Sequence, residues 1–454
     1  MKKKITLLLS LIAFQMNAQC WQTFSSGSTH SLAVLSNGTL WAWGSNASGQ
    51  LGDGTTTNVA LPIQIGTETD WRYVFSGFSS SFAIKTNGTL WVWGSNTNGR
   101  LGTGNTTNLS VPTQVGTDTN WLYIDSKSHT VGVKTDGTLW TWGYNSLGQL
   151  GDGTNTNQYA PILIGSGWSS VTVGANSTNG IKSNGTLWAW GQNNYGQYGN
   201  NTTAESRIPI QIGTATDWSK IASGNNPHIL ATKTNGTLWA WGRNSGGQMG
   251  NGTNIDSKIP VQIGSNTNWS VIAAGQSHSI GIQTNGTLWG WGVNGFGSVG
   301  DNTTTSRNAP VQIGIETDWS FSSFTGSTSF ALKTDGRLLA WGSNSYGEIG
   351  DGTTGSANNR LKPVTITCPI ALSTEDFSPT TFSMYPNPTS DFLNIKNDMN
   401  LSIDTISIMD LTGKKMLEQK GTNSPVNVQP LANGIYMIQI TSEGRSFQNK
   451  FIKS

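Results

Sequence analysis

The sequence predicts an all-β protein: a seven-bladed β-propeller of four-stranded blades, followed by a small C-terminal β-sandwich sorting domain. Three observations carry this prediction. A unit of about fifty residues occurs seven times, every copy places a tight-turn signal between two strand-like runs, and no stretch shows helical periodicity. The composition agrees, because 57 glycines, 20 tryptophans and only 11% charged residues suit short strands joined by tight turns.

The repeat is marked by the run Asn-Gly-Thr-Leu-Trp-Ala-Trp-Gly at residues 37–44. Its second tryptophan returns in every copy, at Trp43, Trp93, Trp142, Trp190, Trp241, Trp291 and Trp341. A third tryptophan opens each copy. In the last copy Leu339 takes the place of the first tryptophan of the run. These slots use every tryptophan in the chain. Since each one buries roughly 150–250 Å², we predict that they pack the blades against one another.

The second copy illustrates the predicted strands, which are 71–75, 81–85 and 89–93, with 62–65 added from the preceding connection. An Asn-Gly or Asp-Gly step joins the middle pair in every copy. This dipeptide predicts a two-residue type I′ turn, in which both residues have φ > 0. Four-stranded units repeated radially form a propeller, which leaves few exposed strand edges.

The chain is predicted to have four segments. Residues 1–18 form a signal peptide, because lysines precede the apolar run 5–14 and small residues follow it. That run is too short to span a bilayer, so no transmembrane segment is expected. The propeller occupies 19–372, a Ser/Thr/Pro linker 373–381, and a β-sandwich with alternating strands 382–454.

The net charge of +2 includes three lysines of the signal peptide, so the remaining chain is close to neutral. It has no basic stripe, which argues against nucleic acid as a partner. The two cysteines occupy slots of the repeat that lie three residues apart in the other connections. Cys20 aligns with Asp70, and Cys368 aligns with Thr67. We therefore predict a disulfide that closes the ring where the peptide does not, in an exported protein that permits it.

The repeat resembles that of the regulator of chromosome condensation family. The matching features in the first copy are Gly27, His30-Ser31-Leu32, Asn37-Gly38, Trp43-Gly44-Ser45-Asn46, Gly49-Gln50-Leu51-Gly52 and Pro62. The resemblance implies a seven-bladed propeller that serves as a binding platform. One branch of that family is a guanine-nucleotide exchange factor, and a secreted bacterial branch inhibits β-lactamases by covering their active sites.

The C-terminal segment resembles the type A sorting domain of the type IX secretion route. The residues that carry this match are Tyr385, Pro386, Asn387, Pro388, Gly434, Tyr436 and the terminal Lys-Phe-Ile-Lys. The resemblance implies the type IX secretion machinery as a partner, passage through the periplasm, and a destination outside the cell or on the outer-membrane surface. It also implies that the domain is removed on the way, at a position that the sequence does not identify.

No residue pattern points to catalysis, a cofactor or a metal. The four histidines share one slot, and the other copies have Ser80, Ser177 and Thr328 there, which favours a local hydrogen-bonding role within the blade. The Gly-Asp-Gly steps at 52–54, 151–153 and 350–352 fit turns better than calcium loops. A glycosidase would need paired carboxylates, and no stretch singles out such a pair. We therefore expect a protein that is not an enzyme.

Candidate ligand-binding residues come from slots that vary between copies, since invariant slots belong to the scaffold. Two loop slots after the marker tryptophan supply Tyr144, Tyr195, Arg243, Phe296 and Tyr346. Tyrosine and arginine are enriched at interface hot spots. We expect a secreted or cell-surface, monomeric recognition module that binds an extracellular protein. The alternative is a glycan-binding or glycan-cleaving propeller, and nucleotide exchange is the least favoured role.

Overall fold

A computed structural model describes residues 20–324, 326–369, 382–397, 402–410, 414–421, 425–442 and 445–454. The chain divides into two compact units, the first ending at Pro369 and the second beginning at Ile370. The predicted signal peptide and linker lie outside the described residues, so the predicted domain boundaries remain predictions.

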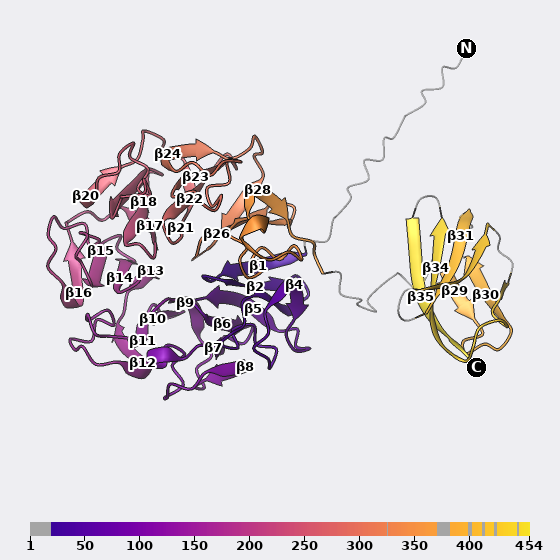
Figure 1. The fold of residues 1–454 in the computed structure, drawn as a ribbon. Helices are drawn as coiled ribbons and strands as arrows, with labels where there is room; N and C mark the ends of the chain where they lie inside the picture. Colours follow the sequence, from indigo (N-terminus) through magenta and orange to yellow (C-terminus); the bar gives the residue numbers. More distant parts are fainter. Residues whose placement is uncertain are drawn as a thin grey trace, which may run out of the picture. The chain divides into compact units, whose positions relative to one another are not determined.

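The first unit is a ring of seven four-stranded antiparallel sheets, numbered here as blades 1 to 7 in chain order (Figure 1). Blades 1 to 3 consist of β1 (Trp21–Ser26), β2 (His30–Leu35), β3 (Leu40–Gly44) and β4 (Val59–Gln64); β5 (Trp71–Ser76), β6 (Ser80–Lys85), β7 (Leu90–Gly94) and β8 (Leu109–Val115); and β9 (Trp121–Ser126), β10 (His129–Lys134), β11 (Leu139–Gly143) and β12 (Gln158–Gly165). Blades 4 and 5 consist of β13 (Trp168–Val173), β14 (Ser177–Lys182), β15 (Leu187–Gly191) and β16 (Ser206–Ile212); and β17 (Trp218–Ser223), β18 (His228–Lys233), β19 (Leu238–Gly242) and β20 (Ser257–Gln262). Blades 6 and 7 consist of β21 (Trp269–Ala274), β22 (His278–Gln283), β23 (Leu288–Gly292) and β24 (Arg307–Gln312); and β25 (Trp319–Ser322), β26 (Thr328–Lys333), β27 (Leu338–Gly342) and β28 (Arg360–Thr365). Two short 3-10 helices, η1 (Thr97–Gly99) and η2 (Ser356–Asn358), lie in the connections.

Each blade is built from one continuous stretch of chain, with its first strand at the centre of the ring and its fourth strand at the rim (Figure 1). The prediction that 62–65 belongs to the second unit is wrong. Pro62 lies in β4, which pairs with β3 in blade 1. The same slot holds a proline in every blade, and proline suits an edge strand because it has no N–H to offer to a further strand.

The turn between the second and third strands also differs from the prediction. Only its glycine has a positive φ, as in Gly38 at 79°. The N–H of Gly38 donates to the carbonyl of Leu35 at 2.9 Å, and Leu35 N–H donates to Thr39 O at 3.0 Å. This is a three-residue loop with a glycine bulge rather than a two-residue type I′ turn. The side chain of Asn37 explains the choice, because its Oδ1 accepts from Thr39 N–H at 3.1 Å and Thr39 Oγ1 at 2.7 Å.

The tryptophans pack blade against blade, as predicted. The marker tryptophans are fully buried. The Nε1 of Trp93 donates to Gln50 O of blade 1 at 2.9 Å, and the seven blades repeat this bond around the ring. Gly52 lies against the same ring, since a Cβ at Gly52 would stand 2.8 Å from Trp93 Nε1. This contact explains why the first glycine of each Gly-x-Gly step recurs.

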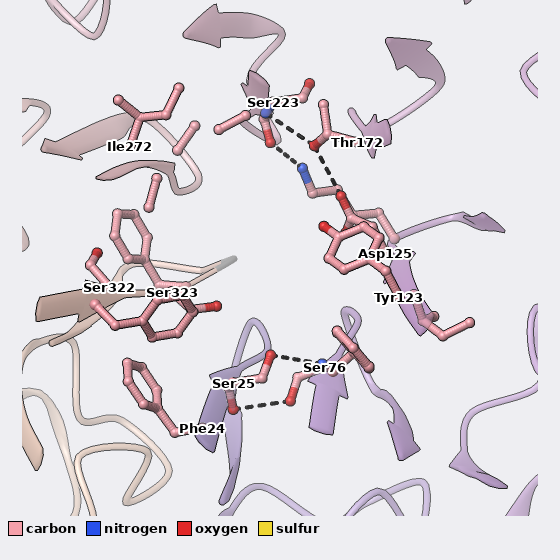
Figure 2. A pocket seen from close by; sticks show the side chains of 18 of the residues that line it. Phe24, Ser25, Ser76, Tyr123, Asp125, Thr172, Ser223, Ile272, Ser322 and Ser323 are labelled. Atoms are coloured by element: carbon pink, nitrogen blue, oxygen red, sulfur yellow. Dashed lines mark hydrogen bonds between the residues drawn. The ribbon is translucent and has the colours of Figure 1, made fainter. Parts of the chain in front are cut away.

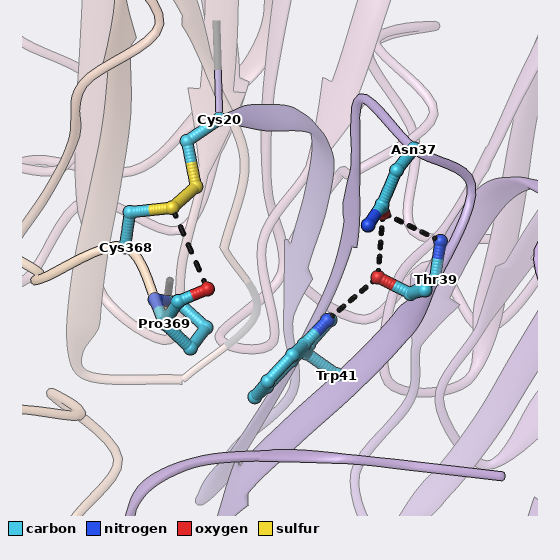
Figure 3. Close-up of a disulfide and its surroundings, with 6 residues drawn as sticks. All are labelled: Cys20, Asn37, Thr39, Trp41, Cys368 and Pro369. Atoms are coloured by element: carbon cyan, nitrogen blue, oxygen red, sulfur yellow. Dashed lines mark hydrogen bonds between the residues drawn. A yellow bond between two sulfur atoms is a disulfide. The ribbon is translucent and has the colours of Figure 1, made fainter. Parts of the chain in front are cut away.

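The ring closes between blades 7 and 1. Trp43 Nε1 donates to Glu348 O at 2.9 Å, so blade 7 docks on blade 1 by the same bond that joins the other blades. Cys20 and Cys368 form the predicted disulfide, with Cα atoms 6.2 Å apart across 348 residues of sequence (Figure 3). The first and last blades share no strand, and the disulfide joins the two ends of the ring covalently.

The second unit is a β-sandwich, as predicted. One sheet contains β29 (Phe382–Tyr385), β30 (Phe392–Asn397) and β33 (Val426–Asn427). The other contains β32 (Lys415–Lys420), β31 (Ile403–Met409), β34 (Gly434–Ser442) and β35 (Arg445–Lys453). Leu393 and Ile395 of the first sheet share one buried core with Ile406, Ile438 and Phe451 of the second.

Candidate functional site

The predicted ligand-binding residues lie in the loops that follow the third strand of blades 3 to 7. Tyr144, Tyr195 and Arg243 are half-buried, whereas Phe296 and Tyr346 are each 48% exposed. These loops share a scaffold, shown in blade 3 by the fully buried Asn145. Its Oδ1 accepts from Leu150 N–H at 3.0 Å, and its Nδ2 donates to Asp152 Oδ1 at 3.0 Å. The variable side chains therefore project from loops of one fixed conformation.

The structure brings one pair of these residues together. The guanidinium of Arg243 in blade 5 lies over the ring of Tyr195 in blade 4, with 5.1 Å between Cζ and the ring centroid. Blades 5 and 6 repeat this geometry with other residues. Gly246 occupies the slot of Tyr195 and Val293 the slot of Arg243, and a Cβ at Gly246 would stand 2.3 Å from Cγ2 of Val293. Among the described residues, no ring or cation contact joins Tyr144, Phe296 or Tyr346 to another member of the set. They lie in separate loops of the ring.

The Gly-Asp-Gly carboxylates serve the same loop scaffold. Asp53 accepts from Asn46 Nδ2 at 3.0 Å and from Thr55 N–H at 3.0 Å, and Asp152 makes the equivalent bonds. Across the described ranges, no group of three or more His, Cys, Asp or Glu side chains is placed to hold a metal ion.

All four histidines contact a hydroxyl of the next blade through Nε2, which corrects the prediction of a role confined to one blade. His30 Nε2 lies 2.9 Å from Ser81 Oγ of blade 2. Ser81 Oγ donates in turn to Gln50 O at 2.6 Å, so the histidine Nε2–H is the donor to the hydroxyl. His129 and His278 contact Thr178 and Ser329 in the same way. His228 differs, because its Nδ1–H donates to Asn226 O at 2.8 Å while its Nε2 lies 3.2 Å from Ser279 Oγ. Burial lowers the pKa of His30, His129 and His278 to about 3 and that of His228 to about 4.

A cavity of about 250 Å³ lies at the centre of the ring and is lined by the first strands of all seven blades (Figure 2). Blade 3 contributes charged side chains to it. The carboxylate of Asp125 accepts from Thr172 Oγ1 at 2.9 Å and from Val173 N–H at 3.0 Å. Lys127 Nζ donates to Val173 O at 2.6 Å and to Ser223 O at 2.5 Å. Blade 3 thereby holds blades 4 and 5 at the axis of the ring.

Burial shifts the pKa values of the titratable groups at this centre. It raises the pKa of Asp125, against the opposing influence of Lys127 and the hydrogen bonds that the carboxylate accepts. It lowers the pKa of Lys127 to about 8, although the charge of Asp125 acts in the other direction. The pKa of Tyr123 is also raised, by desolvation within the ring and then by Asp125, although its side chain is 37% exposed.

The sequence analysis missed Asp125 and Lys127, although a signal was present. Lys127 stands six residues after the tryptophan that opens its copy, where five other copies have glycine: Gly27, Gly77, Gly174, Gly224 and Gly275. The backbone confirms that these positions are equivalent, because Lys127 N–H donates to His129 O as Gly27 N–H donates to His30 O. A comparison of the first-strand slots would have identified the departure.

The predicted sorting residues surround the terminal strand of the second unit. Asn387 Oδ1 accepts from Ile452 N–H at 2.9 Å, and Asn387 Nδ2 donates to Lys450 O at 3.4 Å. Tyr436 stacks on Phe451 at 5.8 Å between ring centroids and donates its hydroxyl to Ala432 O at 3.0 Å. The turn after Tyr385 and the segment that begins at Gly434 therefore meet at the same strand.

Family models match both units. The RCC1-like domain matches residues 126–383, more than half of the chain, and RCC1 repeat models match 37–84 and 87–126, and 21–50 and 71–100. A secretion system C-terminal sorting domain matches residues 383–454, which indicates export through the type IX route to the cell surface or the extracellular space. None of the helices in the described part of the chain has the length and apolar character needed to cross a membrane.

Solved structures resemble the propeller. Human WBSCR16 has a TM-score of 0.64 at 18% sequence identity, with 72% of this chain and 94% of that chain covered. Prp20p from Saccharomyces cerevisiae has a TM-score of 0.60 at 22% identity, covering 68% and 80%. Yeast RCC1 (Prp20) from its complex with Kap60 has a TM-score of 0.65 at 18% identity, covering 82% and 88%. At these identities the likeness supports the fold.

Proposed function

The chain belongs to the RCC1-like domain family, and from this membership we propose that it is an exported, non-catalytic recognition module that binds a protein ligand. The family is generally non-catalytic, and its members act by binding or as exchange factors. Two of the similar structures concern protein partners, since Prp20p was studied for its binding to Gsp1p and histones, and yeast RCC1 was solved bound to Kap60. An exported chain would meet other partners, which favours an adhesin-like or inhibitor-like role.

The contact between Tyr195 and Arg243 is the observation that supports the binding face best. It places an aromatic ring and a guanidinium side by side across two blades, and both residue types are enriched at interface hot spots. Phe296 adds an exposed aromatic side chain in the next blade. The scaffold asparagines hold these loops rigidly, which reduces the entropy lost on binding. The binding unit would be the monomer, with the loops of blades 4 to 6 as its contact surface.

Capture by the immobilised full chain tests this proposal. The bait is exposed to surface extracts of neighbouring cells, with and without protease treatment of the extract. We expect one or more proteins to be captured, and we expect the variant Tyr195→Ala, Arg243→Ala, Phe296→Ala to lose them. Hot-spot truncations of this kind cost about 2 kcal/mol or more each.

The matched control is Leu61→Ala, Ile208→Ala, Ile259→Ala, which removes three half-exposed side chains from the outer strands. The control should capture the same proteins as the parent chain. Equal capture by the loop variant would refute the binding face. Capture that survives protease treatment would refute a protein ligand and favour a glycan.

A further inference from the structure

A lysine ends the second strand of five blades, and blade 4 is the one in which this lysine has no ion pair. In the other four blades it pairs with a carboxylate of the connection that leads into the blade. The Nζ and carboxylate oxygen atoms lie 2.7 to 3.1 Å apart in these pairs: Lys85 with Glu68 and Asp70, Lys134 with Asp118, Lys233 with Asp217, and Lys333 with Asp318. Among the described residues, no ion pair joins Lys182 of blade 4 to a carboxylate.

Two tryptophan rings nevertheless hold the ammonium group of Lys182 as they hold the paired lysines. Its Nζ lies 5.0 Å from the ring centroid of Trp168 and 4.4 Å from that of Trp188. The Nζ of Lys134 lies 4.7 and 4.0 Å from the two equivalent rings of blade 3. Cation–π attraction thus positions the charge of Lys182 before any counter-ion arrives, which lowers the entropy lost when one binds.

The carboxylate is missing because the connection into blade 4 is short. Trp71 stands nine residues after Pro62 of the preceding outer strand, whereas Trp168 stands only seven residues after Pro161. The two lost residues belong to the segment that supplies the acidic partners in the other blades. The absence of a counter-ion is therefore a property of this connection and not of the lysine.

Gly167 stands where three other copies have an aspartate. Its carbonyl accepts from Ser183 N–H at 2.8 Å, and the carbonyl of Asp217 accepts from Thr234 N–H at 2.8 Å in blade 5, so the two positions are equivalent. The space that an aspartate side chain would fill here is open. The nearest atom to a Cβ built on Gly167 is Ser183 Oγ, at 4.0 Å.

The short connection also leaves room beside the turn of blade 3. In five other copies a Cβ on the turn glycine would stand 1.9 to 2.1 Å from a threonine carbonyl of the connection: Gly38, Gly88, Gly185, Gly236 and Gly286. At Gly137 the nearest atom to such a Cβ is Gly167 N, at 3.8 Å. The carboxylate of Asp136 in this turn is engaged locally, because it accepts from Thr138 N–H at 2.9 Å and from Thr138 Oγ1 at 2.6 Å.

We propose that Lys182 binds a carboxylate of a protein ligand, an aspartate or glutamate side chain that takes the place of the absent aspartate. A positioned ammonium group beside an open space is complementary to an anion. The other blades fill this space with a carboxylate carried on a polypeptide, which favours an acidic protein over an acidic glycan.

This site is separate from the binding loops of blades 4 to 6. Lys182 is the last residue of β14, whereas the loop of blade 4 follows Gly191, which pairs with Ser177 at the start of β14. The two sites therefore lie at opposite ends of the blade. The new proposal rests on the proposed function only in taking a protein as the ligand.

The test uses the full chain with ¹⁵N-labelled tryptophan and follows the indole N–H signals of Trp168 and Trp188 by NMR. The probes are the capped peptide acetyl-Gly-Asp-Gly-amide and its asparagine counterpart, at millimolar concentration and low salt. We expect the aspartate peptide to shift both signals saturably and the asparagine peptide to leave them unchanged. The response should weaken at about 0.5 M salt, because salt screens ion pairs that solvent can reach.

Lys182→Gln should abolish the response and still fold, because blade 6 has Gln283 in the same slot. Lys233→Gln is the matched control, since it removes a lysine that already pairs with Asp217. The control should respond like the parent chain. A further variant fills the site from within: residues 165–167 are replaced by the sequence of residues 213–217, which restores the full connection and its aspartate. This variant should lose the response.

Three results would overturn the carboxylate site: no response to the aspartate peptide, an equal response to the asparagine peptide, or an unchanged response in the Lys182→Gln variant. A stronger response to glucuronate than to the aspartate peptide would overturn the protein source and favour an acidic glycan. The loop variant Tyr195→Ala, Arg243→Ala, Phe296→Ala should respond to the peptide like the parent chain. The failure of one proposal is thereby distinguished from the failure of the other.

Discussion

His30 of blade 1 and Ser81 of blade 2 lie 2.9 Å apart, Nε2 to Oγ, and this contact joins the two blades at a fully buried position. The hydroxyl of Ser81 donates a hydrogen bond to the carbonyl of Gln50, which also accepts from Trp93 Nε1. A neutral imidazole fits this network, because its Nε2–H donates and its Nδ1 needs no proton. Charging the ring would place an uncompensated cation inside the propeller.

The depressed histidine pKa values predict that the propeller loses stability in acid. The unfolded chain binds a proton at each histidine below pH 6.5, whereas folded His30 resists protonation down to about pH 3. The histidine contribution to stability is therefore complete above pH 6.5 and is lost as the pH drops toward about 3, or about 4 for His228, by about 1.4 kcal/mol per pH unit for each histidine. Urea unfolding at pH 7 and pH 5 measures the effect.

A single substitution measures how much of this pH dependence comes from His30. His30→Ser reproduces the residue that blade 2 carries in the same slot, Ser80. The variant should lose about one proton's worth of the pH dependence, whatever its stability at pH 7. An unchanged slope would show that His30 protonates normally in the folded protein.

The ring-closing disulfide should contribute substantially to stability. Replacing Cys20 and Cys368 by serine removes a link that closes a loop of 348 residues. We expect the free energy of unfolding of the propeller to fall by about 2–5 kcal/mol, chiefly through the greater freedom of the unfolded chain. Denaturant unfolding of the variant, the parent and the reduced parent measures it. The reduced parent and the variant should have the same free energy of unfolding. Coincident unfolding curves for the variant, the parent and the reduced parent would contradict the prediction.

The charged pair of blade 3 predicts a non-additive double-mutant cycle. Asp125→Ala leaves Lys127 buried without its counter-charge and should cost about 3–5 kcal/mol. Adding Lys127→Gly should restore much of that loss, because the double variant has the alanine and glycine found at the same slots in blade 5, Ala222 and Gly224. Thermal and urea unfolding of the singles and the double measure the coupling energy. Strictly additive losses would show that the two charges do not interact.

The sorting domain should depend on the turn that follows Tyr385. Asn387→Ala removes two hydrogen bonds to the terminal strand, to Ile452 N–H and Lys450 O. We expect a severalfold lower fraction of the protein outside the cell, measured by immunoblot of surface, medium and periplasmic fractions. Glu418→Gln is a control, since Glu418 pairs with Lys415 at an exposed site away from the terminal strand. Normal export of the Asn387 variant would show that the secretion machinery does not need these hydrogen bonds to recognise the domain.

Much of the architecture could be read from the order of residues. The seven copies, the buried tryptophans, the ring-closing disulfide and the sandwich follow from local patterns repeated along the chain, because each slot meets the same environment in every blade. The outer strand was misassigned since its proline lies between two tryptophan runs and could pair with either. The turn was misread because the side-chain bonds of Asn37 outweigh the usual preference of Asn-Gly.

The candidate sites depend on contacts between copies, and a linear pattern does not reveal these. Tyr195 and Arg243 occupy different slots of different repeats, and they meet because the loop of one blade lies against the loop of the next. The partners of the histidines lie on a neighbouring blade for the same reason. Asp125 and Lys127 contact blades 4 and 5 because the first strands converge on the axis of the ring. Local propensity builds each blade, whereas closure of the ring creates the surfaces that can bind.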